Sequence, residues 1–198
     1  MIKKPGSRGL IFVVSGPSGS GKTTLRDELL KDKELRKRLV KAISFTTRPK
    51  RSGELNKKEY FFITKDGFKR KLQAKKILEW TRYLGYYYAT PKDFVEKQLK
   101  KAKHIILCLD LKGALTIKSF FPKNTVTIFI IPPSFKALQD RIERRCHKTK
   151  REEIRERLRI ARKELLASRQ YDYCVVNNNL AQAVKELRGI ILRETLSR

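Results

Sequence analysis

The sequence LIFVVSGPSGSGKTT, residues 10–24, decides the fold of this chain. Its first part, Leu10 to Val14, is a continuous β-branched and aromatic run, which is typical of a strand buried on both faces of a parallel sheet. The segment after it matches the pattern G-x-x-x-x-G-K-[ST], and apolar residues at helical spacing then predict a helix from Lys22 to Lys33. A strand, a glycine-rich loop and a helix in this order begin a βαβ unit.

The glycine-rich loop is predicted to bind the phosphates of a nucleoside triphosphate. Backbone N–H groups of such a loop turn inward around phosphate oxygens, and the helix N-terminus favours negative charge. The Lys22 ammonium would reach the β- and γ-phosphates, and the Thr23 hydroxyl can bind Mg²⁺. The residues expected to bind ATP here are Gly16, Pro17, Ser18, Gly19, Ser20, Gly21, Lys22, Thr23 and Thr24.

Predicted strands and helices alternate along the rest of the chain. The strands are expected at residues 104–110, 126–131 and 173–176, and the helices at 91–102, 134–145, 150–168 and 180–196. This alternation is typical of an α/β fold with a mainly parallel sheet. Between residues 43 and 89 clustered aromatic residues and turn signals interrupt it, which indicates an inserted lobe of short strands.

Composition limits the kind of protein and its partners. A chain of 198 residues with 40% hydrophobic residues is large enough for one core and favours a single domain. The 48 Lys and Arg residues outnumber 20 Asp and Glu residues, so the net charge is +28 and polyanions or phosphate esters are the expected partners. A lysine-rich, solvated surface explains the same excess equally well, so nucleic-acid binding rests on charge alone.

The chain is expected to be cytoplasmic and to have no membrane partner. Its three cysteines, Cys108, Cys146 and Cys174, have no C-x-x-C spacing, and an odd number suits a reducing compartment. The first apolar run is too short for a signal peptide, and no run approaches the ~20 residues that cross a bilayer.

Four motifs follow one another in the inserted lobe: SFTTRPKRSGE at residues 44–54, YFF at 60–62, EW at 79–80 and YYYAT at 86–90. In their order and spacing, and with the glycine-rich loop before them, they resemble the guanylate kinases. The resemblance implies a P-loop NTPase-type parallel sheet flanked by helices, an inserted small mixed α/β acceptor lobe and a mobile helical lid. The single domain 1–198 would comprise a core (1–40, 91–140 and 158–198), a GMP-binding lobe (41–90) and a lid (141–157). The implied reaction transfers the γ-phosphoryl group of Mg-ATP to GMP.

The resemblance also implies the residues of the GMP site. Arg48 and Arg51 would clamp the GMP phosphate together with the hydroxyls of Tyr60 and Tyr88. Glu79 would read the base, because a carboxylate accepts from N1–H and the exocyclic amine of guanine, which adenine does not present. Three more residues match family positions near the base, and the third also matches the water shell of the metal: Ser44, Thr90 and Asp110.

The lid and the end of the core show departures from the family pattern. Residues 141–163 contain eleven Lys or Arg and four Glu, the composition of an exposed helical arm. Arg141 and Arg145 match arginines that precede the family's lid, and Arg157 matches one that follows it, so the resemblance implies that all three contact the triphosphate when the lid closes. Asn177 matches a position beside the adenine of ATP. The family usually has a second acid where this chain has Cys108, which is interpreted as a small buried apolar residue.

The residues leave three alternative functions open. A P-loop kinase of a phosphorylated sugar would not need the base-reading Glu79. A module that holds a phosphopeptide in the acceptor site would not need Lys22. The +28 charge alone would support nucleic-acid binding, which salt weakens steeply. A homo-oligomer is compatible with all of these.

Overall fold

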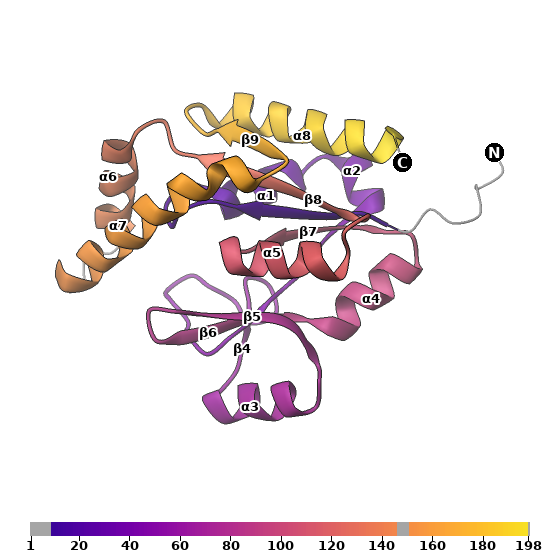
Figure 1. Ribbon diagram of the computed structural model, residues 1–198, viewed down its shortest axis with the longest axis horizontal. Helices are drawn as coiled ribbons and strands as arrows, with labels where there is room; N and C mark the ends of the chain where they lie inside the picture. Colours follow the sequence, from indigo (N-terminus) through magenta and orange to yellow (C-terminus); the bar gives the residue numbers. More distant parts are fainter. Residues whose placement is uncertain (1–8, 146–150, 198) are drawn as a thin grey trace.

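The core of the molecule is a parallel sheet of five strands (Figure 1). The computed structural model describes residues 9–145 and 151–197, with only the backbone of Arg145. The strand order is β2-β7-β1-β8-β9, and each neighbouring pair is parallel. The bounds are β1 Ile11–Ser15, β2 Leu39–Lys41, β7 His104–Cys108, β8 Thr125–Ile131 and β9 Tyr173–Val176. All five residues of β1 are buried because it lies in the middle of the sheet, as its apolar run predicts.

Helices cover both faces of this sheet. Figure 1 shows α1 (Lys22–Leu29) and α8 (Leu180–Ser197) over one face, and α4 (Lys92–Lys100) and α5 (Leu111–Phe120) over the other. Alternate residues of β1 enter the two cores: Phe12 packs with the α1 and α8 side, and Ile11 packs with the α4 and α5 side. The predicted α/β class with a parallel sheet is therefore confirmed.

The inserted lobe has a second, mixed sheet with its own aromatic core. Its elements are β3 Phe45–Thr46, β4 Phe61–Phe62, α3 Lys65–Gln73, β5 Ile77–Tyr83 and β6 Tyr86–Pro91, with strand order β4-β3-β6-β5. Phe68 of α3 is buried, stacks on Tyr87 at 4.5 Å between ring centroids, and meets Trp80 edge-on at 5.9 Å. These three rings hold α3 against the sheet.

Two helices follow the core strand β8 and pack on each other. They are α6 (Phe135–Arg145) and α7 (Arg151–Leu166), and the buried side chains of Leu138, Ile142 and Ala161 form their contact. A short 3₁₀ turn, Ala167–Gln170, leads from α7 into β9. The middle of the predicted lid, residues 146–150 with Cys146, lies outside the described residues. In the described part of the chain, no helix has the length and apolar character needed to cross a membrane.

Several predicted boundaries were wrong for local reasons. The helix expected from Lys22 to Lys33 ends at Leu29, and a second helix, α2 (Lys33–Arg38), begins after a short turn. Asp32 starts α2 because its carboxylate accepts from the Glu34 and Leu35 amides. The strand expected to reach Asp110 ends at Cys108, because the Asp110 carboxylate accepts from the Gly113 amide at 2.8 Å and caps α5. Neither α5 nor α3 was predicted.

Candidate active site

The candidate active site is a cavity of about 580 Å³ between the core sheet, the lobe and α7. Three segments that follow parallel strands line it: the glycine-rich loop after β1, residues 108–110 at the end of β7, and Asn177 after β9. The carboxyl ends of parallel strands meet at one edge of a sheet, which is where ligands bind in open α/β folds. The lobe supplies the opposite wall through β5 and β6.

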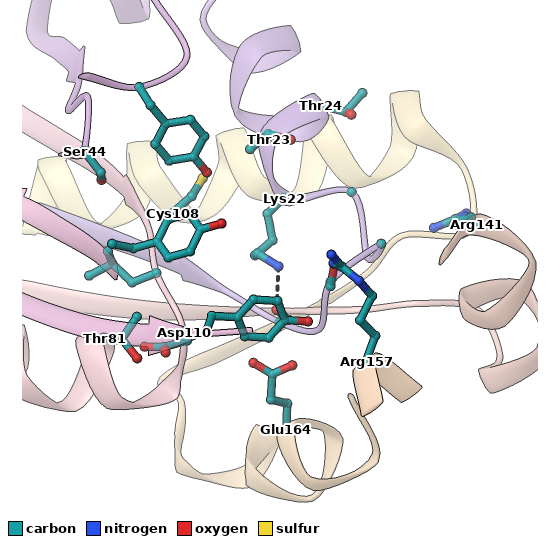
Figure 2. A pocket seen from close by; sticks show the side chains of 18 of the residues that line it. Lys22, Thr23, Thr24, Ser44, Thr81, Cys108, Asp110, Arg141, Arg157 and Glu164 are labelled. Atoms are coloured by element: carbon teal, nitrogen blue, oxygen red, sulfur yellow. Dashed lines mark hydrogen bonds between the residues drawn. The ribbon is translucent and has the colours of Figure 1, made fainter. Parts of the chain in front are cut away.

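The glycine-rich loop is held in place by its own lysine and by Asn177. The Lys22 ammonium donates to the carbonyl oxygens of Gly16 at 2.5 Å and Pro17 at 2.8 Å (Figure 2). The Asn177 amide donates to the Ser20 carbonyl at 2.8 Å, and a Cβ on Gly21 would lie 2.3 Å from that amide nitrogen. Since Gly21 also has φ +94°, glycine is required there for both reasons.

A carboxylate holds the predicted phosphate clamp. The Arg48 guanidinium is 8% exposed, and one of its nitrogens donates to both Glu54 oxygens, at 2.8 and 2.9 Å. Glu54 also accepts from the Arg51 backbone amide at 2.8 Å, so one acid organises the loop that carries both arginines. The Tyr60 ring lies 5.7 Å from the Arg48 guanidinium and meets the Tyr88 ring edge-on at 5.9 Å. This arrangement places two cations and two phenols around one end of the cavity.

Glu79 is a buried carboxylate facing the cavity from β5. It is 5% exposed, and it accepts from the Thr90 hydroxyl at 2.5 Å. Burial raises the pKa of the Glu79 carboxyl to about 7, against the opposing hydrogen bond from Thr90 and with a contribution from the charge of Asp110. Helix α5 approaches the Glu79 carboxylate closely through Gly113. A Cβ on Gly113 would lie only 2.9 Å from Glu79 Oε2. A carboxylate so enclosed needs a hydrogen-bond donor in the cavity to ionise at low cost.

Comparisons of sequence and of overall structure with known proteins agree on one family. A family model described as guanylate kinase matches residues 8–194. The chain belongs to the guanylate kinase family. It is 42% identical to the guanylate kinase of Caldanaerobacter subterraneus subsp. tengcongensis, covering 98% of this chain and 90% of that one, and 39% identical to that of Bacillus subtilis, covering 96% and 92%. A solved guanylate kinase from Anaplasma phagocytophilum matches with a TM-score of 0.79 and 29% identity, covering 95% of this chain and 87% of that one.

Most site residues expected from the guanylate kinase resemblance line the one cavity. They are Gly16, Ser18, Gly19, Gly21, Lys22, Thr23, Thr24, Ser44, Arg48, Arg51, Tyr60, Glu79, Tyr88, Asp110, Arg141, Arg157 and Asn177. Pro17, Ser20 and Thr90 are not among the lining residues: the first two shape the loop, and Thr90 is fully buried behind Glu79. The side chain of Arg145 lies outside the described residues.

The guanylate kinase cavity also contains residues that sequence reasoning missed. Thr81 and Tyr83 line it from β5, two and four residues after Glu79, and period-two alternation from that residue could have found them. Glu164 of α7 points into it beside Lys22 and Asp110 (Figure 2). Burial raises the pKa of Glu164 to about 7, with Lys22 opposing the shift and Asp110 adding to it. No local pattern in the sequence marks Glu164.

The interpretation of Cys108 as a small buried apolar residue was wrong about its burial. Cys108 is half buried and lines the cavity, and its Sγ lies 3.8 Å from the nearest guanidinium nitrogen of Arg26. Arg26 is 7% exposed and also donates to the carboxylate of Asp27, at 2.9 and 3.0 Å. The thiol is exposed to the cavity because it ends β7 at the carboxyl edge of the sheet. It therefore faces a cation where the family usually has an acid.

Proposed function

We propose that the cavity binds both substrates of the guanylate kinase reaction, in which the γ-phosphoryl group of ATP is transferred to GMP. Family membership gives the chain this activity. The observation that supports the residue assignment is that one cavity joins the P-loop lysine Lys22 to the paired arginines Arg48 and Arg51 and to the buried acid Glu79. A triphosphate at one end and a nucleoside monophosphate at the other would place the two phosphate chains end to end.

The acceptor half recognises a purine monophosphate by charge and by hydrogen bonding. Arg48, oriented by Glu54, and Arg51 bind the phosphate dianion, while Tyr60 and Tyr88 offer hydroxyl groups to it. Glu79 accepts two hydrogen bonds from guanine, and Thr90 holds its carboxylate from behind. Ser44 lines the same end of the cavity and adds a hydroxyl near the base. The predicted lobe at residues 41–90 thus corresponds to the GMP-binding unit.

The donor half stabilises the charge on the transferred phosphoryl group. On ATP binding, Lys22 exchanges its contacts with loop carbonyls for phosphate oxygens, and the loop amides surround the rest of the triphosphate. Arg141 and Arg157 line the cavity on the α6 and α7 side and would neutralise charge that develops during transfer. Arg145 is assigned the same role from the resemblance alone. Asn177, with its side chain holding the P-loop, lies where adenine is expected.

The donor set of the cavity suits Mg²⁺ carried by ATP. Thr23 and Asp110 both line the cavity, and hydroxyl and carboxylate oxygens are ligands that this hard cation prefers. Among the described residues, no three His, Cys, Asp or Glu side chains are grouped to hold a metal ion. Thr23 and, through water, Asp110 would hold the ion, as the resemblance implies. When bound, Mg²⁺ supplies charge neutralisation of the β- and γ-phosphates.

The proposed reaction is a direct in-line transfer. The GMP phosphate oxygen attacks the γ-phosphorus, the bond to the ADP oxygen breaks, and no covalent enzyme intermediate forms. No general base is required, because the attacking phosphate is already a dianion. The protein contributes alignment of the two phosphates by Arg48 and Lys22 and a preformed positive field.

The first test is a coupled assay of ADP release with ATP, Mg²⁺ and each of GMP, AMP, UMP and CMP. Turnover with GMP and not with the other three is the expected result. No ADP release with any of the four nucleotides would instead favour a sugar-phosphate kinase or a module that binds a phosphopeptide. Nucleic-acid binding and self-association remain predictions from the sequence, and a salt titration of DNA binding and a sedimentation measurement test them.

Gly113→Ala tests the close approach of α5 to Glu79. The added methyl would lie 2.9 Å from Glu79 Oε2 and 3.3 Å from Asp110 Oδ1, so the carboxylate must move. We expect KM for GMP to rise at least about tenfold, since small displacements of a recognition group are costly, while KM for ATP stays within about twofold. Gly189→Ala is the matched control, because a Cβ at Gly189 of α8 meets nothing within 4 Å. Equal KM values for the two variants would contradict the assignment of Glu79.

Cys108→Asp tests the departure from the family pattern. An acid there would face the buried Arg26 and add negative charge near the proposed Mg²⁺ ligand Asp110. We expect the Mg²⁺ concentration for half-maximal rate to fall about threefold, the effect of a modest added attraction. Cys174→Asp is the control at an exposed cysteine outside the cavity. Superimposable Mg²⁺ titrations of Cys108→Asp and wild type would show that position 108 does not influence the metal.

A further inference from the structure

Strand β5 runs along the cavity from the proposed guanine site toward the P-loop. Glu79, Thr81 and Tyr83 line the cavity, while Trp80 and Arg82 between them are exposed on the other face. Four residues of strand span about 13 Å, so Tyr83 lies far from Glu79. The strand turns back directly after Tyr83, through Leu84 and Gly85, which both have positive φ as a two-residue hairpin requires. Tyr83 is thus the last cavity-facing side chain that β5 supplies.

Tyr83 makes a contact between the acceptor lobe and α7. The Arg157 guanidinium lies 5.8 Å from the centroid of the Tyr83 ring, a distance that suits a cation–π contact. The Tyr83 hydroxyl is buried without a hydrogen-bond partner in the described part of the chain. Burial raises the pKa of the Tyr83 hydroxyl, and the charge of Arg157 opposes the shift.

Arg157 is a largely buried side chain that lines the cavity from α7. It forms an ion pair with Glu153, one turn earlier, at 2.6 Å, and its side chain is 10% exposed. An arginine side chain has many rotamers, so each contact that it makes narrows their number. The Tyr83 ring adds a contact from the acceptor lobe, outside α7. Figure 2 shows Arg157 and Glu164, two turns apart on α7, both directed into the cavity.

We propose that Tyr83 is a positioning residue for phosphoryl transfer, whose ring holds the Arg157 guanidinium over the junction of the donor and acceptor phosphates. The inference rests on the proposed function, because it gives Arg157 the role of neutralising charge during transfer. It links the two substrate sites, because the strand that carries the base-reading Glu79 also places an arginine of α7. The arginine is then in place only when the acceptor lobe is seated against α7.

The test separates positioning from folding by kinetics. Tyr83→Ala should lower kcat about tenfold, the effect of losing one partly buried cation–π contact that orients a charge, with KM for GMP and for ATP within about threefold. Tyr83→Phe keeps the ring and should retain at least about half of kcat. Arg82→Ala, an exposed neighbour on the opposite face, should match wild type. If Tyr83 served only to fold the lobe, the main effect would be a higher KM for GMP, and the proposal would be wrong.

A double variant shows whether the effect passes through Arg157. Tyr83→Ala combined with Arg157→Ala should be no slower than Arg157→Ala alone, because the ring then has nothing to position. Multiplicative losses in the double variant would overturn the proposal, as would a Tyr83→Phe variant as slow as Tyr83→Ala. A wild-type chain without GMP-dependent ADP release would instead refute the proposed function, so the two failures are distinguishable.

Discussion

Lys22→Met is expected to lower kcat for GMP phosphorylation by about a thousandfold, as the loss of a preorganised donor to a transferring phosphoryl group does. Methionine retains the aliphatic stem and removes the ammonium that reaches the β- and γ-phosphates. In the structure without substrate, that ammonium donates to the Gly16 and Pro17 carbonyls, so it already lies beside the phosphate-binding loop. The loss should therefore appear in the chemical step more than in folding.

Two measurements accompany the Lys22→Met kinetics. The thermal midpoint should stay within about 4 °C of wild type, since two hydrogen bonds at a half-exposed site contribute modestly. Calorimetric binding of GMP alone should be unchanged, because Glu79 and Arg48 are intact. Lys31→Met provides the matched control, because Lys31 follows α1, is 73% exposed and forms an ion pair with Glu28 on the surface. More than a tenth of wild-type kcat in Lys22→Met would contradict the role given to this lysine.

Glu79→Gln is expected to lower kcat/KM for GMP by about two to three orders of magnitude, because a buried recognition group is left facing a mismatched donor. Glutamine can still accept from the Thr90 hydroxyl, as Glu79 does at 2.5 Å, but its amide NH₂ opposes the N–H donors of guanine. KM for ATP should change less than about twofold, since Glu79 lies in the acceptor half. Glu186→Gln on exposed α8 is the control. Equal kcat/KM in Glu79→Gln and wild type would exclude Glu79 as the base reader.

The same substitution should stabilise the protein without substrate. Burial raises the pKa of Glu79 from 4.5 to about 7, so the folded state holds a proton that the unfolded chain releases between these values. The destabilisation of the folded state by this carboxyl is absent below pH 4.5, grows up to pH 7 and is constant above it. Its full size is about 3 kcal/mol, which corresponds to about 5 to 10 °C in Tm at pH 8. The gain in Tm should vanish at pH 4.5, and a gain independent of pH would show that the carboxyl is not the cause.

Local patterns in the sequence were sufficient for the core fold and for much of the candidate site. The apolar run of β1, the glycine spacing after it and the strands β7, β8 and β9 depend on neighbours in the chain, so their order predicts a parallel sheet with a phosphate loop at its edge. The residues of the acceptor lobe were found by resemblance to a family, not by periodicity. The predicted element boundaries were wrong where a single capping side chain sets the start of a helix, as Asp32 and Asp110 do.

Only the tertiary structure shows which residues work together across the cavity. Tyr83 and Arg157 belong to different units, and their contact exists because the hairpin after β5 reaches α7. Glu164 of α7 and Lys22 of the P-loop line the same cavity although they are far apart in the chain. Gly113 leaves room for Glu79 where helix α5 approaches strand β5. Side-chain spacing along the chain carries no information on such pairs, because the distance between them is set by how separate elements pack. The sequence thus determined the core strands β1, β7, β8 and β9 and the donor loop, and packing determined the partners of each charged group in the site.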